Sequence, residues 1–159
     1  MKKPPISKRP FSLWLLALLL LFIGIGALIS GPMLFLSPKG EAMQMSLDYL
    51  EGSPFPNYLV PGIILFLFIG VFPVFIGYGL LRTPGWRWPN VINPVKTSHW
   101  AWAGAWATGI IMLMWISVET VLLGYISFLQ PFIGAWGAII IILAFWPSTK
   151  QYLIRSAED

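Results

Sequence analysis

The chain has 159 residues, of which 57% are hydrophobic and only 10% are charged, and its formal net charge at pH 7 is +4. Soluble domains carry about 25% charged residues, so this composition excludes an ordinary soluble domain and indicates a multi-pass membrane protein. The absence of cysteine excludes disulfides and thiolate-bound metals. The basic residues flank the hydrophobic runs, which indicates contact with anionic membrane lipids and no binding of nucleic acid.

The first hydrophobic run, residues 11–30, follows a start that is rich in lysine, arginine and proline. That start resembles a signal peptide, but the run of about 20 residues exceeds the roughly 7–15 of a signal-peptide core. No cleavage site of the A-x-A type follows it. We therefore expect an uncleaved first transmembrane helix. Gly24, Ala27 and Gly31 share one face of this helix, on which a neighbouring helix can approach closely.

The first polar connection, residues 37–57, contains the apolar residues Met43, Met45, Leu47 and Leu50 between acidic ones. This spacing permits a short amphipathic helix at the membrane surface. A solvated loop with a few apolar contacts is an equally good interpretation.

The second span is predicted over residues 58–81. Pro73 in its interior removes a backbone donor and predicts a kink, which membrane helices tolerate when neighbours satisfy the freed carbonyl. The connection that follows, residues 82–99, contains three prolines and one glycine and is predicted to be irregular. Tryptophan and arginine near the ends of the spans are typical of anchors at the membrane surface. The predicted anchors are Trp86, Arg87, Trp88, Trp100 and Trp146.

The third span is predicted over residues 98–123, and its first half alternates tryptophan with small residues. Ala101, Ala105 and Gly109 share one face, which favours close helix packing. A tryptophan-rich face can also hold a flat hydrophobic ligand. The fourth span is predicted over residues 128–146.

The positions of lysine and arginine predict the topology. If the spans alternate, four basic residues at the N-terminus, three in the second connection and two in the tail lie on one side, and only Lys39 lies on the other. The positive-inside rule makes the side with nine basic residues cytoplasmic. The sequence thus predicts an all-α membrane protein, a four-transmembrane-helix bundle in a single domain with both termini cytoplasmic.

Glu119 is the only acidic residue inside a hydrophobic run. It follows His99 by twenty residues, which is about 30 Å of helix, the thickness of the hydrocarbon core, so it should lie near the outer boundary. One interpretation is a ligand-binding or proton-accepting carboxylate at the mouth of an outward-facing groove. The other is a helix-end carboxylate that is solvated or bonded to Gln130 and Tyr125. The predicted ligand-binding residues are Glu119, Gln130, Tyr125 and Trp115.

Motifs for catalysis, phosphate binding and dinucleotide binding are absent from the sequence, and we predict no catalytic residue, metal site or cofactor. We expect a non-enzymatic accessory or structural protein that packs against copies of itself or within a larger membrane complex. The alternative is a small transporter or lipophile-binding protein that uses Glu119. In helix count and in its single membrane carboxylate, the chain is similar to the small multidrug transporters. The similarity ends there, because their carboxylate lies deep in the first helix, whereas Glu119 lies near the end of the third. A third hypothesis is a membrane enzyme acting on lipid headgroups, with Glu119, Asp48 and Glu51 as its acids.

Two segments, GSPFPNYLVPGIILF at residues 52–66 and WISVETVLLGYISFLQP at residues 115–131, carry a further resemblance. They resemble segments of small four-span bacterial membrane proteins of unknown function, in which an SPF turn leads into a Pro-Gly helix start and a polar residue follows a Trp-Ile pair. The resemblance implies the same fold and a bacterial cytoplasmic membrane. It implies no activity, cofactor or substrate.

Overall fold

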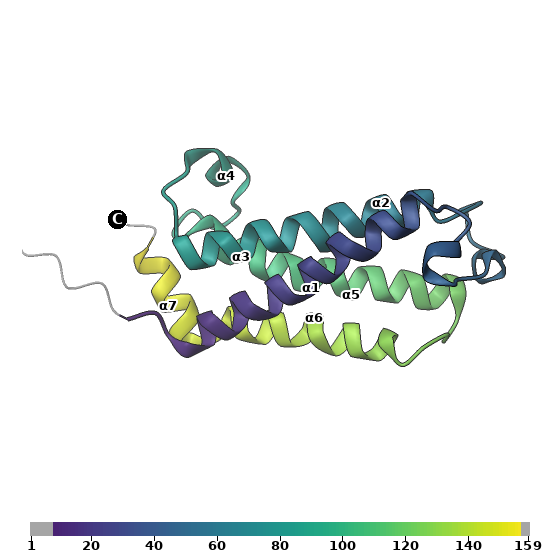
Figure 1. Cartoon of the computed structure of the whole chain (residues 1–159). Coiled ribbons are helices and arrows are strands. Elements are labelled where there is room, and N and C mark those ends of the chain that lie inside the picture. The colour runs from purple at the N-terminus through teal and green to yellow at the C-terminus, as the bar shows by residue number, and fades with distance from the viewer. Residues whose placement is uncertain (1–7, 157–159) are drawn as a thin grey trace, which may run out of the picture.

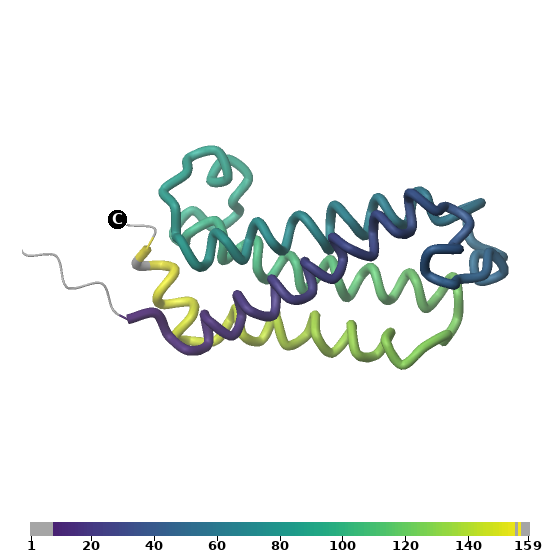
Figure 2. The backbone as a smooth tube through the Cα atoms, in the orientation of Figure 1, coloured from purple at the N-terminus to yellow at the C-terminus, as the bar shows by residue number. Residues whose placement is uncertain are grey.

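The computed structural model describes residues 8–156, and every regular element in that range is helical (Figures 1 and 2). The predicted all-α fold is therefore confirmed for the described residues, while Lys2 and Lys3 of the basic start lie outside them. The long helices are α1 (Phe11–Phe35), α5 (Trp100–Leu123), α6 (Leu129–Phe145), and a continuous helix built from α2 (Leu59–Ile64), the π-helical η3 (Leu65–Val71) and α3 (Phe72–Arg82). The short helices are η1 (Glu41–Met43), η2 (Leu47–Leu50), α4 (Arg87–Ile92) and α7 (Pro147–Arg155).

Three of these helices are long and apolar enough to cross a membrane: α1, the continuous helix Leu59–Arg82, and α5. A fourth candidate span exists if α6 and α7 are taken together, although they meet at an angle of 57°. The bend falls at Trp146 and Pro147, because proline cannot continue the hydrogen bonds of α6 but is well suited to the first turn of a new helix. Helix α6 alone has 17 residues, or about 25 Å of length.

Glycine residues allow the long helices to approach closely. A Cβ atom on Gly31 of α1 would lie 2.7 Å from the Cβ of Phe66, and one on Gly109 of α5 would lie 2.7 Å from the carbonyl oxygen of Gly137 in α6. Both are far inside normal contact distance, so neither position admits a side chain unless the helices move apart. The small-residue faces predicted from the sequence are confirmed, since all their members are buried: Gly24, Ala27, Gly31, Ala101, Ala105 and Gly109.

The second long helix changes its hydrogen-bonding pattern just before Pro73. The Phe72 N–H donates to the Leu67 carbonyl, five residues back, as in a π-helix. Proline has no N–H, and in an α-helix its ring would clash with the carbonyl of Ile69, so a wider turn relieves the conflict. The kink itself stays a prediction.

The second connection was predicted to be irregular, and this was wrong because residues Arg87–Ile92 form α4. Pro89 lies in the first turn of this helix, where its missing N–H would have no partner in any case. At the other end of α4, the Lys96 ammonium donates to the carbonyls of Asn90 and Val91. Pro89 is therefore compatible with the start of α4, and Lys96 satisfies carbonyl groups at its end.

The first connection forms two short 3₁₀ helices, η1 and η2, and no continuous helix, so of the two interpretations it is nearer to the loop with a few apolar contacts. Gly40 has φ +84°, and a Cβ atom there would lie 2.3 Å from the Met45 carbonyl oxygen. The Tyr58 hydroxyl donates to the Ser46 carbonyl at 2.7 Å, and the Tyr58 N–H donates to the Pro38 carbonyl at 2.9 Å. These two hydrogen bonds hold the loop against the bundle. A separate helix lying on the membrane surface could not form them.

One end of the bundle, which we call the basic end, contains residues 8–10, residues 83–99 and α7 (Figure 1). Helix α7 was not predicted from the sequence. This helix is held by hydrogen bonds from Thr149 Oγ1 to Ser12 Oγ at 2.7 Å and from the His99 N–H to the Leu153 carbonyl at 2.9 Å. Leu153 is fully buried. The opposite, acidic end contains residues 36–58 and 124–128.

His99 caps α5 at the basic end and is 5% exposed. Its Nδ1 accepts a hydrogen bond from the Ala101 N–H at 3.3 Å, so the proton of the neutral ring is assigned to Nε2, which donates to the Pro84 carbonyl at 3.1 Å. Burial lowers the pKa of His99 below its usual value, although the bond to Pro84 opposes this. A second proton would point Nδ1–H at the Ala101 N–H and abolish the cap.

We expect the stability of the folded chain to fall as the pH drops below about 6.5, the ordinary histidine pKa. The unfolded chain protonates His99 there and the folded chain only at lower pH, so the unfolded state binds more protons between the two values. Thermal unfolding of the detergent-solubilised protein between pH 7.5 and pH 5 measures this. His99→Asn, a capping residue that does not titrate, should remove that part of the pH dependence. An unchanged pH dependence would show that His99 is not its source.

Candidate functional site

The predicted site lies at the acidic end, where the last turns of α5 meet the first turn of α6. Met112 and Ile116 are buried, and Glu119 continues the same face of α5 one turn further on. Glu119 is half-buried and therefore belongs to the side of α5 that faces the bundle. Gln130, from the first turn of α6, is 4% exposed.

The Glu119 carboxylate lies within hydrogen-bonding reach of two side chains, Trp115 one turn earlier on α5 and Gln130 across on α6. Both side chains offer an N–H donor, the indole of Trp115 and the amide of Gln130. Glu119 thus lies between α5 and α6, close to the loop that joins them.

Gln130 also organises the loop that joins the two helices. Its Oε1 accepts from the Ile126 N–H at 2.9 Å and the Ser127 N–H at 3.5 Å, and its Nε2 donates to the Gly124 carbonyl at 3.0 Å. Backbone groups that leave a helix lose their partners and need new ones. A single buried amide supplies these partners and keeps a second N–H for Glu119.

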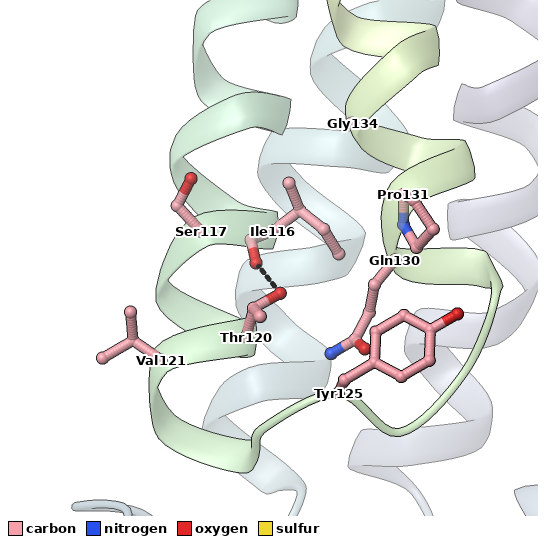
Figure 3. Close-up of a pocket in the computed structure, with 8 residues that line it drawn as sticks. All are labelled: Ile116, Ser117, Thr120, Val121, Tyr125, Gln130, Pro131 and Gly134. Carbon is pink, nitrogen blue, oxygen red and sulfur yellow. Dashed lines mark hydrogen bonds between the residues drawn. The ribbon is translucent and has the colours of Figure 1, made fainter.

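A surface groove of about 490 Å³ opens beside this cluster, between the adjoining ends of α5 and α6 (Figure 3). Its walls combine apolar side chains with hydroxyl groups and a glycine. The Thr120 hydroxyl donates to the Ile116 carbonyl at 2.7 Å, while Tyr125 is 71% exposed. The lining residues are Ile116, Ser117, Thr120, Val121, Tyr125, Gln130, Pro131 and Gly134.

The structure brings together three of the four predicted ligand-binding residues: Glu119, Trp115 and Gln130. Tyr125 instead lines the groove, and Glu119 does not. The hydroxyls of Ser117 and Thr120 were not predicted as site residues. Their signal in the sequence was their spacing of three residues, which puts two polar groups on one face of an apolar helix.

The acidic residues of the first connection do not extend this site. Within residues 8–156, no group of three acidic or histidine side chains is placed to hold a metal ion. Asp48 accepts a hydrogen bond from the Ser46 hydroxyl at 2.8 Å in its own loop. Glu51 is exposed.

The predicted membrane anchors gather at the basic end. Trp86, Trp88 and Trp146 are 37%, 61% and 52% exposed, respectively, and Arg87 is also exposed. Trp100 differs, because it is 4% exposed and stacks inside the protein.

No family model, curated protein or solved structure matches the chain.

Replacing Gln130 with leucine should destabilise the protein by about 1–3 kcal/mol, since it leaves the Ile126 N–H and the Gly124 carbonyl without their partner. Thermal unfolding in detergent measures the loss, and hydrogen exchange at the Ile126 amide should accelerate. Tyr125→Phe is the matched control in the same loop, with an expected change within about 0.5 kcal/mol. Equal stabilities of the two variants would show that the amide does not hold the loop.

Proposed function

We propose that the chain is an integral membrane protein with four spans, in which α6 is the fourth and α7 lies at the membrane surface. The distribution of charge supports this. Of the eight basic residues between positions 8 and 156, six lie at the basic end, Arg82 is the last residue of α3 next to it, and only Lys39 lies at the acidic end. By the positive-inside rule the basic end, with both termini, faces the cytoplasm. On the resemblance of residues 52–66 and 115–131, we propose the bacterial cytoplasmic membrane as its location.

Within this membrane we propose a non-enzymatic role as an accessory subunit that receives a helix of a partner in the groove between α5 and α6. Lipid chains are as apolar as leucine, so membrane helices associate through close packing and interhelical hydrogen bonds. The groove offers both, with an exposed Ser117 hydroxyl and the bare backbone of Gly134.

Gly134 is the observation that carries this proposal. A Cβ atom there would meet nothing closer than the Ile116 side chain at 3.8 Å, whereas one on Gly137, one turn further along α6, would lie 3.1 Å from the Gly109 carbonyl oxygen. Packing within the chain therefore requires Gly137 and does not require Gly134. The absence of a side chain at Gly134 deepens the groove and leaves room for an outside helix.

Site-directed crosslinking tests this role. The protein has no cysteine, so Ser117→Cys provides a single thiol in the groove, to which a photo-reactive maleimide can be attached in native membranes. We expect one discrete covalent adduct, and its mass shows whether the partner is a second copy or another protein. Met114→Cys, 63% exposed on the same helix but outside the groove, should give only lipid adducts.

Filling the groove provides the second arm. Gly134→Leu should abolish the adduct at position 117 without unfolding the protein, because the site has space for a side chain. Lipid adducts alone at both thiol positions, or an adduct that persists with leucine at position 134, would overturn the proposal.

The second candidate is a small transporter or lipophile-binding protein that uses Glu119. The groove supports this second candidate, because Gln130 lines the groove and also lies beside Glu119. A cation bound in the groove would be separated from the Glu119 carboxylate only by the side-chain amide of Gln130. Glu119→Gln keeps the shape and removes the charge. We expect tetraphenylphosphonium, a lipophilic cation, to be retained equally by proteoliposomes of wild type and Glu119→Gln, with the Ser117→Cys adduct unchanged. Retention that is lost only in Glu119→Gln would favour the second candidate.

A further inference from the structure

A second groove, of about 340 Å³, opens at the basic end between α3, α4 and α5. Five of its thirteen lining residues are aromatic, and they come from all three helices: Phe72, Phe75, Trp88, Trp100 and Trp106. It is separate from the groove at Glu119, which lies near the other end of α5. Two of the membrane anchors predicted from the sequence, Trp88 and Trp100, therefore also line a concave site.

The rings at this wall are stacked and hold one another in place. Phe75 stacks on Trp100 at 5.0 Å with an interplanar angle of 21°, and Trp86 lies 6.1 Å from Trp100 at only 6°. Such pairs stabilise each other beyond the area they bury, so Phe75 and Trp100 are held in place before any ligand arrives. A rigid apolar wall is suited to a hydrocarbon chain, which needs no directional bonds.

The rim of the groove is apolar and open to the surroundings. Trp88 is 61% exposed and Ile92 is 79% exposed, both on the side of α4 that lines the groove. Val91, the neighbour of Ile92, is 79% exposed as well. Three large exposed apolar side chains on so short a helix are expected where lipid covers them.

Two arginines lie close along their helices to residues that line the groove, although neither lines it itself. Arg87 directly precedes Trp88 on α4, and Arg82 lies two turns beyond Phe75 on the same face of α3. Both are exposed. Arg82 also interacts favourably with the C-terminal dipole of α3, whereas a cation in the first turn of α4 is disfavoured by that helix. The stability of α4 therefore does not explain why an arginine occupies position 87.

No carboxylate neutralises these two charges within the described chain. The sequence has no acidic residue between Glu51 and Glu119, and both of those lie at the acidic end. The remaining cation of the connection, Lys96, is engaged by the carbonyls at the end of α4. Guanidinium groups match the oxygens of a phosphate in charge and in planar geometry.

We propose that this groove is a binding site for an anionic phospholipid. One acyl chain lies along the aromatic wall, and the phosphate is bound by Arg87 and Arg82. The inference rests on the membrane insertion proposed above and not on the partner helix. Basic pockets between membrane helices on the cytoplasmic side are places where acidic headgroups bind.

The test compares two lipids with identical chains, phosphatidylglycerol and phosphatidylcholine, added to delipidated protein in detergent and counted by native mass spectrometry. We expect selective retention of phosphatidylglycerol. Arg87→Gln should weaken it about fivefold, and Arg82→Gln with Arg87→Gln about 25-fold, because each cation near an anionic headgroup contributes by about that factor. Lys39→Gln, the same charge change at the acidic end, should have no effect.

Blocking the groove tests the acyl chain. Ala107→Trp should reduce binding of both lipids, while Ala135→Trp on the exposed surface of α6 should not. Phosphatidylglycerol with brominated chains should quench tryptophan fluorescence of the unmodified protein, and excess glycerol phosphate should not displace it. Equal retention of the two lipids, or displacement by glycerol phosphate, would overturn the proposal. Absence of the Ser117→Cys adduct would not bear on it.

Discussion

Backbone-to-backbone contact at glycine is the interaction on which this bundle depends. Helix α1 lies against the second long helix at Gly31 and Gly62, and α5 lies against α6 at Gly109 and Gly137. Water drives apolar helices together in a soluble protein, but lipid does not, so membrane helices gain from how closely they approach. Gly26 of α1 has nothing within 4 Å of its Cβ position, which shows that glycine is required at the contacts and not throughout the helix.

Because the long helices satisfy their own backbones, the polar and irregular parts of the chain gather at the two ends. At each end, one buried polar side chain makes several hydrogen bonds with the backbone. His99 caps α5 and bonds to Pro84 at the basic end, and Gln130 bonds to the loop at Gly124 and Ile126 at the acidic end. Beside each of these lies a groove, one lined by hydroxyls and Gly134, the other by aromatic rings and aliphatic side chains.

Hydropathy and small-residue spacing were enough to predict the all-α fold and the buried faces of α1 and α5, because both patterns act within one helix. Helix α7 was not predicted, since it is polar and held by Ser12 and His99, far away in the sequence. Helix α4 was missed because proline was taken as a helix breaker, although Pro89 lies in a first turn. At the candidate site, Glu119 was recognisable as the only acidic residue inside a hydrophobic run, but the bonding of the loop by Gln130 depends on a turn geometry that no periodic pattern reveals.

The central claim is that four helices cross the membrane and leave the basic end inside. Three single-cysteine variants of this cysteine-free chain test it most directly: Lys39→Cys at the acidic end, and Thr97→Cys and Lys150→Cys at the basic end. A membrane-impermeant maleimide applied to intact cells should label position 39 and should label positions 97 and 150 only after permeabilisation. Labelling of position 150 together with position 39 in intact cells would show that α6 does not cross the membrane, and the account would be wrong.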